Sequence, residues 1–192
     1  MDLDAAASTL LNAWSGSSGL LLSLSDVPSP ASITEVYALH AAMACHPLFK
    51  GKLGGLGGYK QGGIGAAVDP ATGEPVLAAY GILPRIGLLE ERQGSRASDP
   101  ITSKHALNLF GLEAEIGFVM SADLVPREAS AYTEAEVWAA VGQVRLTIEL
   151  VGRRFDLALA GDASSLQSLG DASCAGAVVL GKSWQRDEDG CP

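Results

Sequence analysis

The sequence predicts an α+β fold with a mixed sheet. Helix-like segments come first, at about residues 4–14 and 32–45, and runs with strand alternation dominate the second half of the chain. A later helix that begins near Thr133 leads into a strand carrying Glu149. Helices gathered early and strands gathered late are typical of the α+β class. A chain of 192 residues fits one domain, which we expect over residues 1–182.

The two early helices are predicted from their boundary signals and apolar spacing. A Ser/Gly-rich stretch after Trp14 ends the first helix. Ser32 and Glu35 form a capping box for the second, in which the hydroxyl and the carboxylate each accept a backbone N–H. Pro47 ends that helix. The expected core positions are Leu10, Leu11, Trp14, Val36, Leu39 and Met43.

Residues 51–65 contain eight glycines. We expect them to let the backbone bend sharply and approach another segment or a ligand closely, with Lys60 delivered among them. A dinucleotide-binding loop is disfavoured, because its fingerprint needs a strand before it and a helix after it, whereas a turn at residues 69–73 follows here. Short apolar runs interrupted by proline and glycine over residues 74–89 predict one or two short strands in an otherwise irregular segment.

Three acids lie in two apolar runs with strand character. In residues 112–119, Glu113 and Glu115 fall on one side of the strand and the apolar side chains on the other. In residues 144–151, Glu149 lies among leucine and β-branched residues. Burying paired carboxylates without a counter-charge is costly, so this pattern indicates an oxygen site for Mg²⁺ or Mn²⁺. The alternative is that both strands are half-exposed and the glutamates face solvent.

The remaining elements are predicted from local pattern. The segment Thr133–Glu136 is a second capping box that begins a helix. The predicted apolar side of this helix comprises Val137, Val141 and Val144. We expect a polar connection over residues 153–170 and a compact apolar strand over residues 175–181. An acidic, unstructured tail is expected over residues 183–192.

Composition excludes several classes of function. A net charge of −9 without a Lys/Arg cluster argues against nucleic acid. The longest early apolar run, residues 19–24, is too short to span a bilayer, and the acidic N-terminus is unlike a presequence. Three cysteines without CxxC spacing favour a reducing compartment. We therefore expect a soluble, cytoplasmic protein that binds neither nucleic acid nor membrane, and that would need a metal ion or lysine to bind an anionic small molecule.

Seven segments, in this order, resemble motifs of the 2-keto-4-pentenoate hydratase family within the fumarylacetoacetate hydrolase superfamily. The first three correspond to the family's Ala-Tyr-x-x-Gln helix, Gly-Trp/Tyr-Lys motif and Gly-x-Leu segment: residues 33–40 (ITEVYALH), 58–60 (GYK) and 80–83 (YGIL). The fourth resembles the family's Glu-x-Glu-Ile-Ala-Phe-Val strand, and three more follow: residues 113–119 (EAEIGFV), 148–151 (IELV), 172–176 (ASCAG) and 179–181 (VLG). Each motif alone is unspecific, whereas seven in register are specific as a set.

The resemblance implies a mixed sheet or β-roll of the fumarylacetoacetate hydrolase type with N-terminal helices. It implies a Mg²⁺ or Mn²⁺ site at Glu113, Glu115 and Glu149, with Lys60 as the catalytic lysine. In the family the ion chelates the 1-carboxylate and 2-oxo group of a 2-oxo acid and stabilises enolate character. The implied reaction is hydration of a short 2-hydroxy-dienoate or 2-oxo acid such as 2-keto-4-pentenoate. Decarboxylation of an oxo-dioate or C–C bond hydrolysis would use the same chemistry.

The sequence departs from the family in length and in two motifs. Family members continue after the Val-Leu-Gly strand for roughly another third of a chain, whereas this chain ends eleven residues after Gly181, which predicts an incomplete fold at the C-terminus. Gly170-Asp171 replaces the family's Asp-Asn, and His40 replaces its Gln. A shortened, non-catalytic structural or assembly subunit is therefore the second hypothesis. Open sheet edges and apolar surface favour a homo-oligomer or a place in a larger assembly.

Three further residues are candidates for substrate binding. His40 fits either a substrate contact or a partly buried structural role. Arg153, beside Arg154, fits either a site for a second substrate carboxylate or a solvated charge pair. Ser173 lies in a motif segment, but no histidine and acid accompany it in the sequence as partners of a nucleophile.

Overall fold

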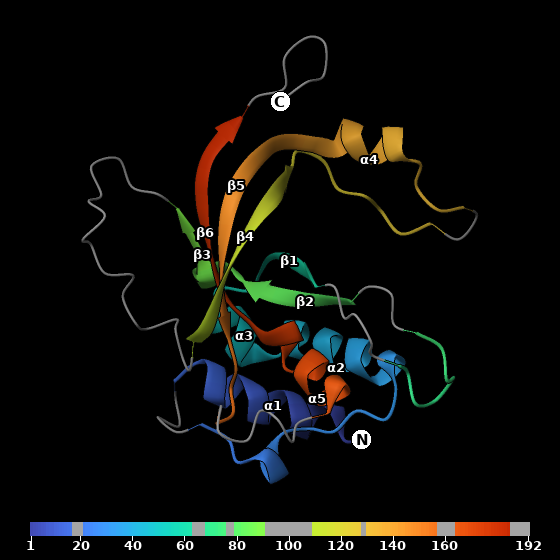
Figure 1. Cartoon of the computed structure of the whole chain (residues 1–192), viewed down its shortest axis with the longest axis vertical. Helices are drawn as coiled ribbons and strands as arrows, with labels where there is room; N and C mark the ends of the chain where they lie inside the picture. The colour runs from blue at the N-terminus through green and yellow to red at the C-terminus, as the bar shows by residue number, and fades with distance from the viewer. Residues whose placement is uncertain are drawn as a thin grey trace.

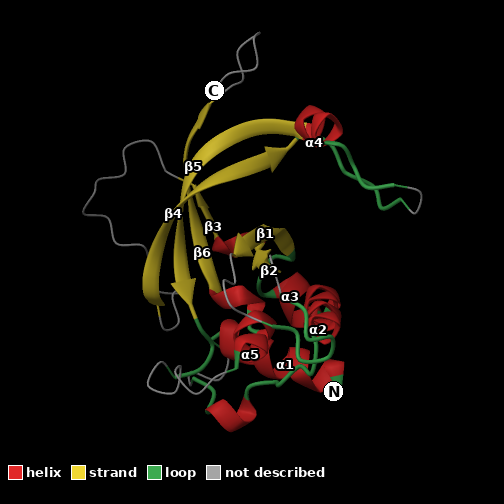
Figure 2. Cartoon of the chain, turned by 45° about the vertical axis from the view of Figure 1, so that its right-hand side comes forward, coloured by secondary structure: helices red, strands yellow, loops and turns green. Residues whose placement is uncertain are grey.

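A computed structural model of the chain shows a helical layer, a small β-hairpin and a curved sheet that rises away from the helices (Figure 1). The structure describes residues 1–16, 21–62, 68–75, 79–90, 109–127, 130–156 and 164–184. Figure 2 shows the hairpin between the helices and the concave side of the sheet. The predicted α+β class with a mixed sheet is confirmed.

The helical layer is formed by α1 (Leu3–Trp14), α2 (Ile33–Cys45), α3 (Pro47–Gly51) and α5 (Ser165–Gly170). All six predicted core positions of the first two helices are at most 5% exposed. Ser32 caps α2 as predicted, accepting the Glu35 N–H at 3.2 Å. The Glu35 carboxylate instead accepts the N–H of Ala31 at 2.8 Å, so the second half of the capping box lies one residue earlier than predicted. Helix α5 lies within the segment predicted as a polar connection, and its Ser164 N-cap was not recognised in the sequence.

The main sheet has the strand order β3-β6-β5-β4. Its strands are β3 (Leu88–Glu90), β4 (Leu109–Met120), β5 (Val141–Gly152) and β6 (Ala175–Trp184). β3 runs parallel to β6, and the other neighbours are antiparallel. β6 continues to Trp184, so residues 183 and 184 of the expected tail are part of a strand. Residues 185–192 of that tail lie outside the described residues.

The hairpin consists of β1 (Leu56–Gly62) and β2 (Ala79–Pro84), which pair antiparallel. Gly54 and Gly55, directly before β1, both have φ of +75°, a conformation that glycine adopts without strain. This is the sharp bend that the glycine-rich segment predicts, and it turns the chain from α3 into β1. Residues 63–65 of that segment lie outside the described residues.

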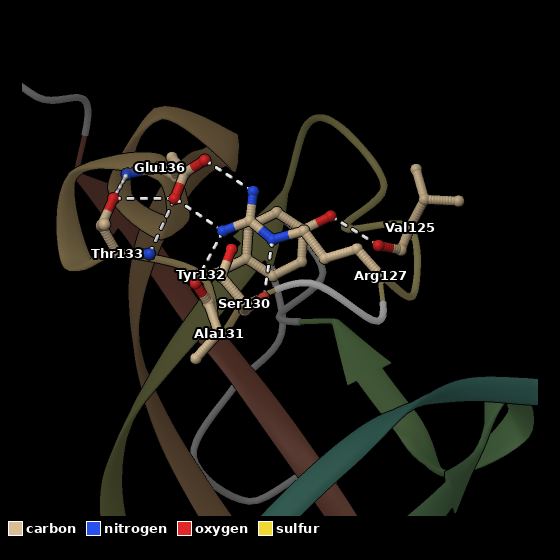
Figure 3. A network of polar contacts seen from close by, with 7 residues as sticks. All are labelled: Val125, Arg127, Ser130, Ala131, Tyr132, Thr133 and Glu136. Atoms are coloured by element: carbon tan, nitrogen blue, oxygen red, sulfur yellow. Dashed lines mark hydrogen bonds and ion pairs between the residues drawn. The ribbon is translucent and has the colours of Figure 1, made fainter.

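Helix α4 (Glu134–Ala140) begins at the predicted capping box. The Glu136 carboxylate accepts the Thr133 N–H at 2.7 Å and two hydrogen bonds from Arg127, at 2.8 and 2.9 Å (Figure 3). Of the three valines predicted for the apolar side of this helix, only Val137 lies in α4, so the prediction is wrong for the other two. Val141 and Val144 belong to β5, because β-branched residues around Gly142 favour a strand over continued helix.

A buried ion pair connects the end of β5 to the start of β6. Arg154 is 2% exposed, and its Nε donates to the Asp171 carboxylate while its backbone N–H donates to the second carboxylate oxygen at 3.0 Å. The guanidinium also donates to the carbonyl oxygens of Asp171 and Ala175 and lies 4.1 Å over the Trp14 ring. Between Asp171 and Ala175, three consecutive non-glycine residues have φ values of 51° to 61°. Such backbone persists only where surrounding contacts hold it.

One face of β4 and β5 is apolar and exposed. The exposed fractions there are Leu112 71%, Ile116 59%, Phe118 52%, Leu146 53% and Ile148 47%. These residues alternate along their strands with the three glutamates, so they lie on the opposite face of the sheet. An exposed apolar face of this kind marks a binding surface or an association surface. No helix in the described part of the chain combines the length and apolar character needed to cross a membrane.

We expect Asp171→Ala to lower the free energy of unfolding by about 3–5 kcal/mol, because it leaves the Arg154 charge buried without its carboxylate. Urea denaturation followed by circular dichroism measures the change. Arg127→Ala, which removes an arginine from an exposed ion pair, is the matched control and should alter stability far less. Equal effects of the two substitutions would contradict the structural importance of the buried pair.

Candidate metal centre

The strand register brings the three predicted acids together. Glu113 of β4 lies directly opposite Glu149 of β5, and Glu115 lies opposite Thr147. Residues directly opposite in an antiparallel pair share a face, as do residues two apart in one strand. One carboxylate oxygen from each of the three glutamates lies within 4.8 Å of the others. Their predicted role as metal ligands stays a prediction, but the geometry needed for it is present.

Lys60 reaches this cluster from the hairpin. Its Nζ lies 2.9 Å from Glu149 Oε2 and 3.8 Å from Glu113 Oε2. The lysine side chain is 7% exposed, that of Glu149 is fully buried, and that of Glu113 is 55% exposed. The cluster is therefore closed on the side of Glu149 and open to solvent on the side of Glu113. The hypothesis that the glutamates merely face solvent does not hold for Glu149.

Burial and mutual repulsion both act on the carboxylates. Burial raises the pKa of Glu149 above its ordinary value; the Lys60 ammonium opposes this shift, and the charges of Glu115 and Glu113 add to it. Burial also raises the pKa of Glu115, again opposed by Lys60 and reinforced by Glu113. One ammonium thus faces three carboxylates. The excess negative charge favours a further cation between them.

The buried oxygens of Glu149 fit a metal ion. Apart from the ion pair with Lys60, neither oxygen accepts a hydrogen bond from any residue that the structure describes. With the Lys60 ammonium as its one described partner, this buried carboxylate remains costly, and coordination to a hard cation would reduce that cost. Three carboxylates without sulfur or imidazole suit Mg²⁺ or Mn²⁺. Glu113, Glu115 and Glu149 are the residues that would hold the ion.

Ser173 lies against the hairpin that carries Lys60. It belongs to the left-handed turn that Arg154 holds, and its Oγ is buried without a hydrogen-bond partner among the described residues. Gly81 of β2 pairs with Lys60, and a Cβ on Gly81 would lie 1.9 Å from the carbonyl oxygen of Ala172 and 3.1 Å from Ser173 Cβ. Only glycine permits this close approach of β2 to the turn.

The described contacts of the other two candidates do not include the three glutamates. His40 is 1% exposed, and its Nε2 lies 2.9 Å from the carbonyl oxygen of Leu169, which fits the structural role considered for it. The guanidinium of Arg153 stacks on Phe110 and Phe155, 4.9 and 5.2 Å from their ring centroids. Neither arrangement supports a substrate contact at the acidic cluster.

Two residues on the glutamate face were missed in the sequence. Arg145, Thr147 and Glu149 follow one another at two-residue spacing in β5 and pair with Gly117, Glu115 and Glu113 without a register shift. Thr147 is 5% exposed, and Arg145 Nη1 lies 3.5 Å from the Glu90 carboxylate. The alternation that identified the acids extends to Arg145, and this signal could have placed it on the same face.

A pocket of about 420 Å³ lies away from the acidic cluster. Phe118, Met120, Val137 and Trp138 line it, between the end of β4 and helix α4. Phe118 belongs to the apolar face of the sheet, opposite the glutamates. The pocket therefore extends the apolar face and is separate from the candidate metal centre.

No protein-family model and no curated protein sequence matches the chain. Among solved structures, the chain is similar to 4-oxalocrotonate decarboxylase from Pseudomonas putida G7 in two complexes. The complex with magnesium and adipate gives a TM-score of 0.65 at 18% identity, covering 97% of this chain and 65% of that chain. The complex with calcium and acetate gives a TM-score of 0.63 at 18% identity, covering 97% of this chain and 64% of that chain.

The chain has the fold of this decarboxylase. The similarity confirms the predicted α+β fold, with N-terminal helices and a mixed sheet. At 18% identity it shows the fold alone, so the hydratase family named from the sequence is not established. The chain spans slightly less than two thirds of the length of either decarboxylase structure.

We expect His40 to make stability fall in mild acid. Burial lowers the pKa of His40 from 6.5 to about 4, so between these values the unfolded chain binds a proton that the folded chain does not. Its contribution is fully present above pH 6.5 and is lost as pH falls to about 4, by roughly 3 kcal/mol.

Urea denaturation of the native chain and of His40→Gln, at pH 7 and pH 4.5, isolates this contribution because titrating carboxylates act alike in both proteins. The native chain should lose more stability than the variant between the two pH values. Equal losses would show that His40 is not held neutral by burial.

Proposed function

We propose that the chain is a divalent-metal-dependent lyase acting on a 2-oxo acid, and that decarboxylation of a 2-oxo-dioate is favoured over hydration. The observation that carries the proposal is the buried Glu149 carboxylate, with Glu113, Glu115 and Lys60 gathered around it. A buried carboxylate with one ammonium partner and two further carboxylates beside it is unfavourable for stability, and coordination to a metal ion would offset that cost.

The protein's own residues would bind and orient the substrate. A bound Mg²⁺ or Mn²⁺ supplies Lewis-acid polarisation of a 2-oxo group and its neighbouring carboxylate. Glu113 lies on the open side of the cluster, so a substrate would enter there while Glu149 holds the closed side. Glu149 and Lys60 are shielded from water on that closed side, which strengthens the electrostatic interactions made there.

Lys60 would act on the charge that develops on the substrate. Its side chain is 7% exposed, and its ammonium is held at the cluster by Glu149. In that position it would stabilise negative charge on the 2-oxo oxygen or transfer a proton to the carbon skeleton. In decarboxylation of 2-oxohex-3-enedioate, the bond between C5 and the C6 carboxylate breaks, CO₂ leaves, and the electron pair passes through the C3–C4 double bond toward the 2-oxo oxygen. A proton then returns to carbon.

The preference for decarboxylation comes from the fold comparison. The similar structures are of a decarboxylase, one of them complexed with magnesium and the dicarboxylate adipate. Hydration of 2-hydroxypenta-2,4-dienoate remains the sequence-based expectation, and both reactions need the same acids and lysine. Direct assay distinguishes them.

We expect calorimetric titration with Mg²⁺ or Mn²⁺ to show one site per chain, and Glu115→Gln to weaken binding roughly 10- to 100-fold, because one of three carboxylate ligands is lost. Glu74→Gln is the matched control, since it makes the same chemical change on an exposed residue that is not part of the cluster. If the native chain binds no metal ion, or if both variants bind it equally well, the proposed metal centre would be contradicted.

The same preparation then decides the reaction. With metal present, CO₂ release from 2-oxohex-3-enedioate would support decarboxylation, and loss of 2-hydroxypenta-2,4-dienoate absorbance would support hydration. Lys60→Met should reduce either rate at least about 100-fold, because the positioned ammonium is lost. Metal binding without turnover of either compound would favour the second candidate function.

The second candidate is a structural or assembly subunit. The exposed apolar face of β4 and β5 favours it, since an apolar patch of this extent is unusual on a monomer. We infer a second copy of the chain as the occupant, because a face-to-face contact between two such sheets would bury each other's leucine, isoleucine and phenylalanine side chains.

We expect the native chain to form dimers or larger species at micromolar concentration, and Ile116→Lys to shift it toward monomer, because the substitution places a charge in the middle of the apolar face. Analytical ultracentrifugation measures the solution mass. Val68→Lys, on an exposed residue outside the face, is the control. A native chain that is monomeric at all concentrations would rule out this association.

A further inference from the structure

We propose that Arg145 binds the distal carboxylate of a linear dicarboxylic 2-oxo acid and thereby selects dicarboxylates over monocarboxylates. The inference rests on the metal-dependent function proposed above and names the substrate class of that site. The observation that supports the proposal is the register of β4 and β5. It places the Arg145 side chain on the face of the three glutamates, four residues before Glu149 in β5.

The face is fixed by the strand pairing. From Glu113 to Gly117, β4 pairs with β5 from Glu149 to Arg145 without a register shift. Arg145 therefore points to the same side of the sheet as Glu149, with Thr147 between them. The Cα atoms of Arg145 and Glu149 are about 13 Å apart along the strand.

This separation suits a short linear diacid. A six-carbon dioate spans roughly 6 Å between its two carboxyl carbons when extended. With its 2-oxo end at the glutamate cluster, its far carboxylate would lie about halfway toward the Cα of Arg145. The arginine side chain is long enough to cover the remainder. A monocarboxylate of equal length would place a methyl group at the same point.

The guanidinium of Arg145 has N–H donors that the described contacts leave weakly paired or without an acceptor. Arg145 Nη1 lies 3.5 Å from the Glu90 carboxylate, and the Glu90 side chain is 73% exposed, so this contact is long and solvent-screened. Arg145 Nε is buried and has no acceptor among the described residues. Lys60, a second cation at this face, is already paired with Glu149. A substrate carboxylate would supply the acceptor that Nε lacks, in the bidentate geometry that arginine favours.

The test compares two probes that differ only at the distal end, 2-oxoadipate and 2-oxohexanoate. Calorimetry on the full chain with saturating Mg²⁺ measures both dissociation constants. We expect the native chain to bind 2-oxoadipate roughly 10- to 100-fold more tightly, since a charge-assisted bond at a part-buried arginine has this effect. Arg145→Gln should reduce 2-oxoadipate binding to the level of 2-oxohexanoate, leaving 2-oxohexanoate and Mg²⁺ binding unchanged.

Two further variants separate a direct contact from a general effect. Glu90→Gln removes the competing carboxylate and should maintain or increase the preference for 2-oxoadipate. Arg127→Gln removes the same charge from an exposed position outside the site and should preserve the preference. Loss of Mg²⁺ binding in Arg145→Gln would assign the arginine a structural role and overturn the proposal.

The outcomes distinguish this inference from the function on which it rests. Equal binding of the two probes by the native chain overturns the role of Arg145 and leaves the metal centre and the 2-oxo acid site in place. If Arg145→Gln still prefers 2-oxoadipate to 2-oxohexanoate, the role of Arg145 is likewise overturned and the metal centre stays in place. Binding of neither probe by the Mg²⁺-loaded chain overturns the proposed function and the inference together.

Discussion

The guanidinium of Arg154 connects parts of the chain that are far apart in sequence. It contacts the Asp171 carboxylate, the backbone carbonyl groups of Asp171 and Ala175 on either side of the turn, and the ring of Trp14 in α1. The left-handed backbone of Ala172–Cys174 persists because these contacts surround it. That turn is the surface on which Gly81 of β2 rests. The position of the hairpin, and with it the position of Lys60, therefore depends on a buried ion pair that touches none of the three glutamates.

Local patterns predicted the elements whose signals lie within a few residues. The amphipathic spacing of α1 and α2 and the alternation around Glu113 and Glu115 are of this kind. The shared face of Glu113 and Glu115 followed from the alternation of side chains along a strand, because residues two apart point to the same side. Their pairing with Glu149 did not, because register between strands is set by packing over the whole sheet. The same limit applies to Lys60, whose hairpin meets the cluster through tertiary contacts.

The errors also have physical causes. The valine spacing around Val137 fits a helix, but Val141 and Val144 continue into β5, where pairing on both sides outweighs the local pattern. Helix α5 has only six residues and a polar sequence, so hydrophobic periodicity does not detect it. The burial of Asp171 could not be predicted, because the sequence offers no sign that Arg154 is buried beside it. Buried polar pairs of this kind are specified by the fold around them.

β4 forms one edge of the sheet among the described residues, and it is also the strand that carries Glu113 and Glu115. A twelve-residue edge with an apolar face invites the addition of strands from other chains. Paired negative charges on such an edge oppose that addition, since two copies would bring like charges together. A divalent ion bound by these acids would neutralise the charge that keeps edges apart. If the proposed metal site is correct, metal loading and colloidal stability would oppose each other in this chain, because the same two carboxylates would act as ligands and as a barrier to aggregation.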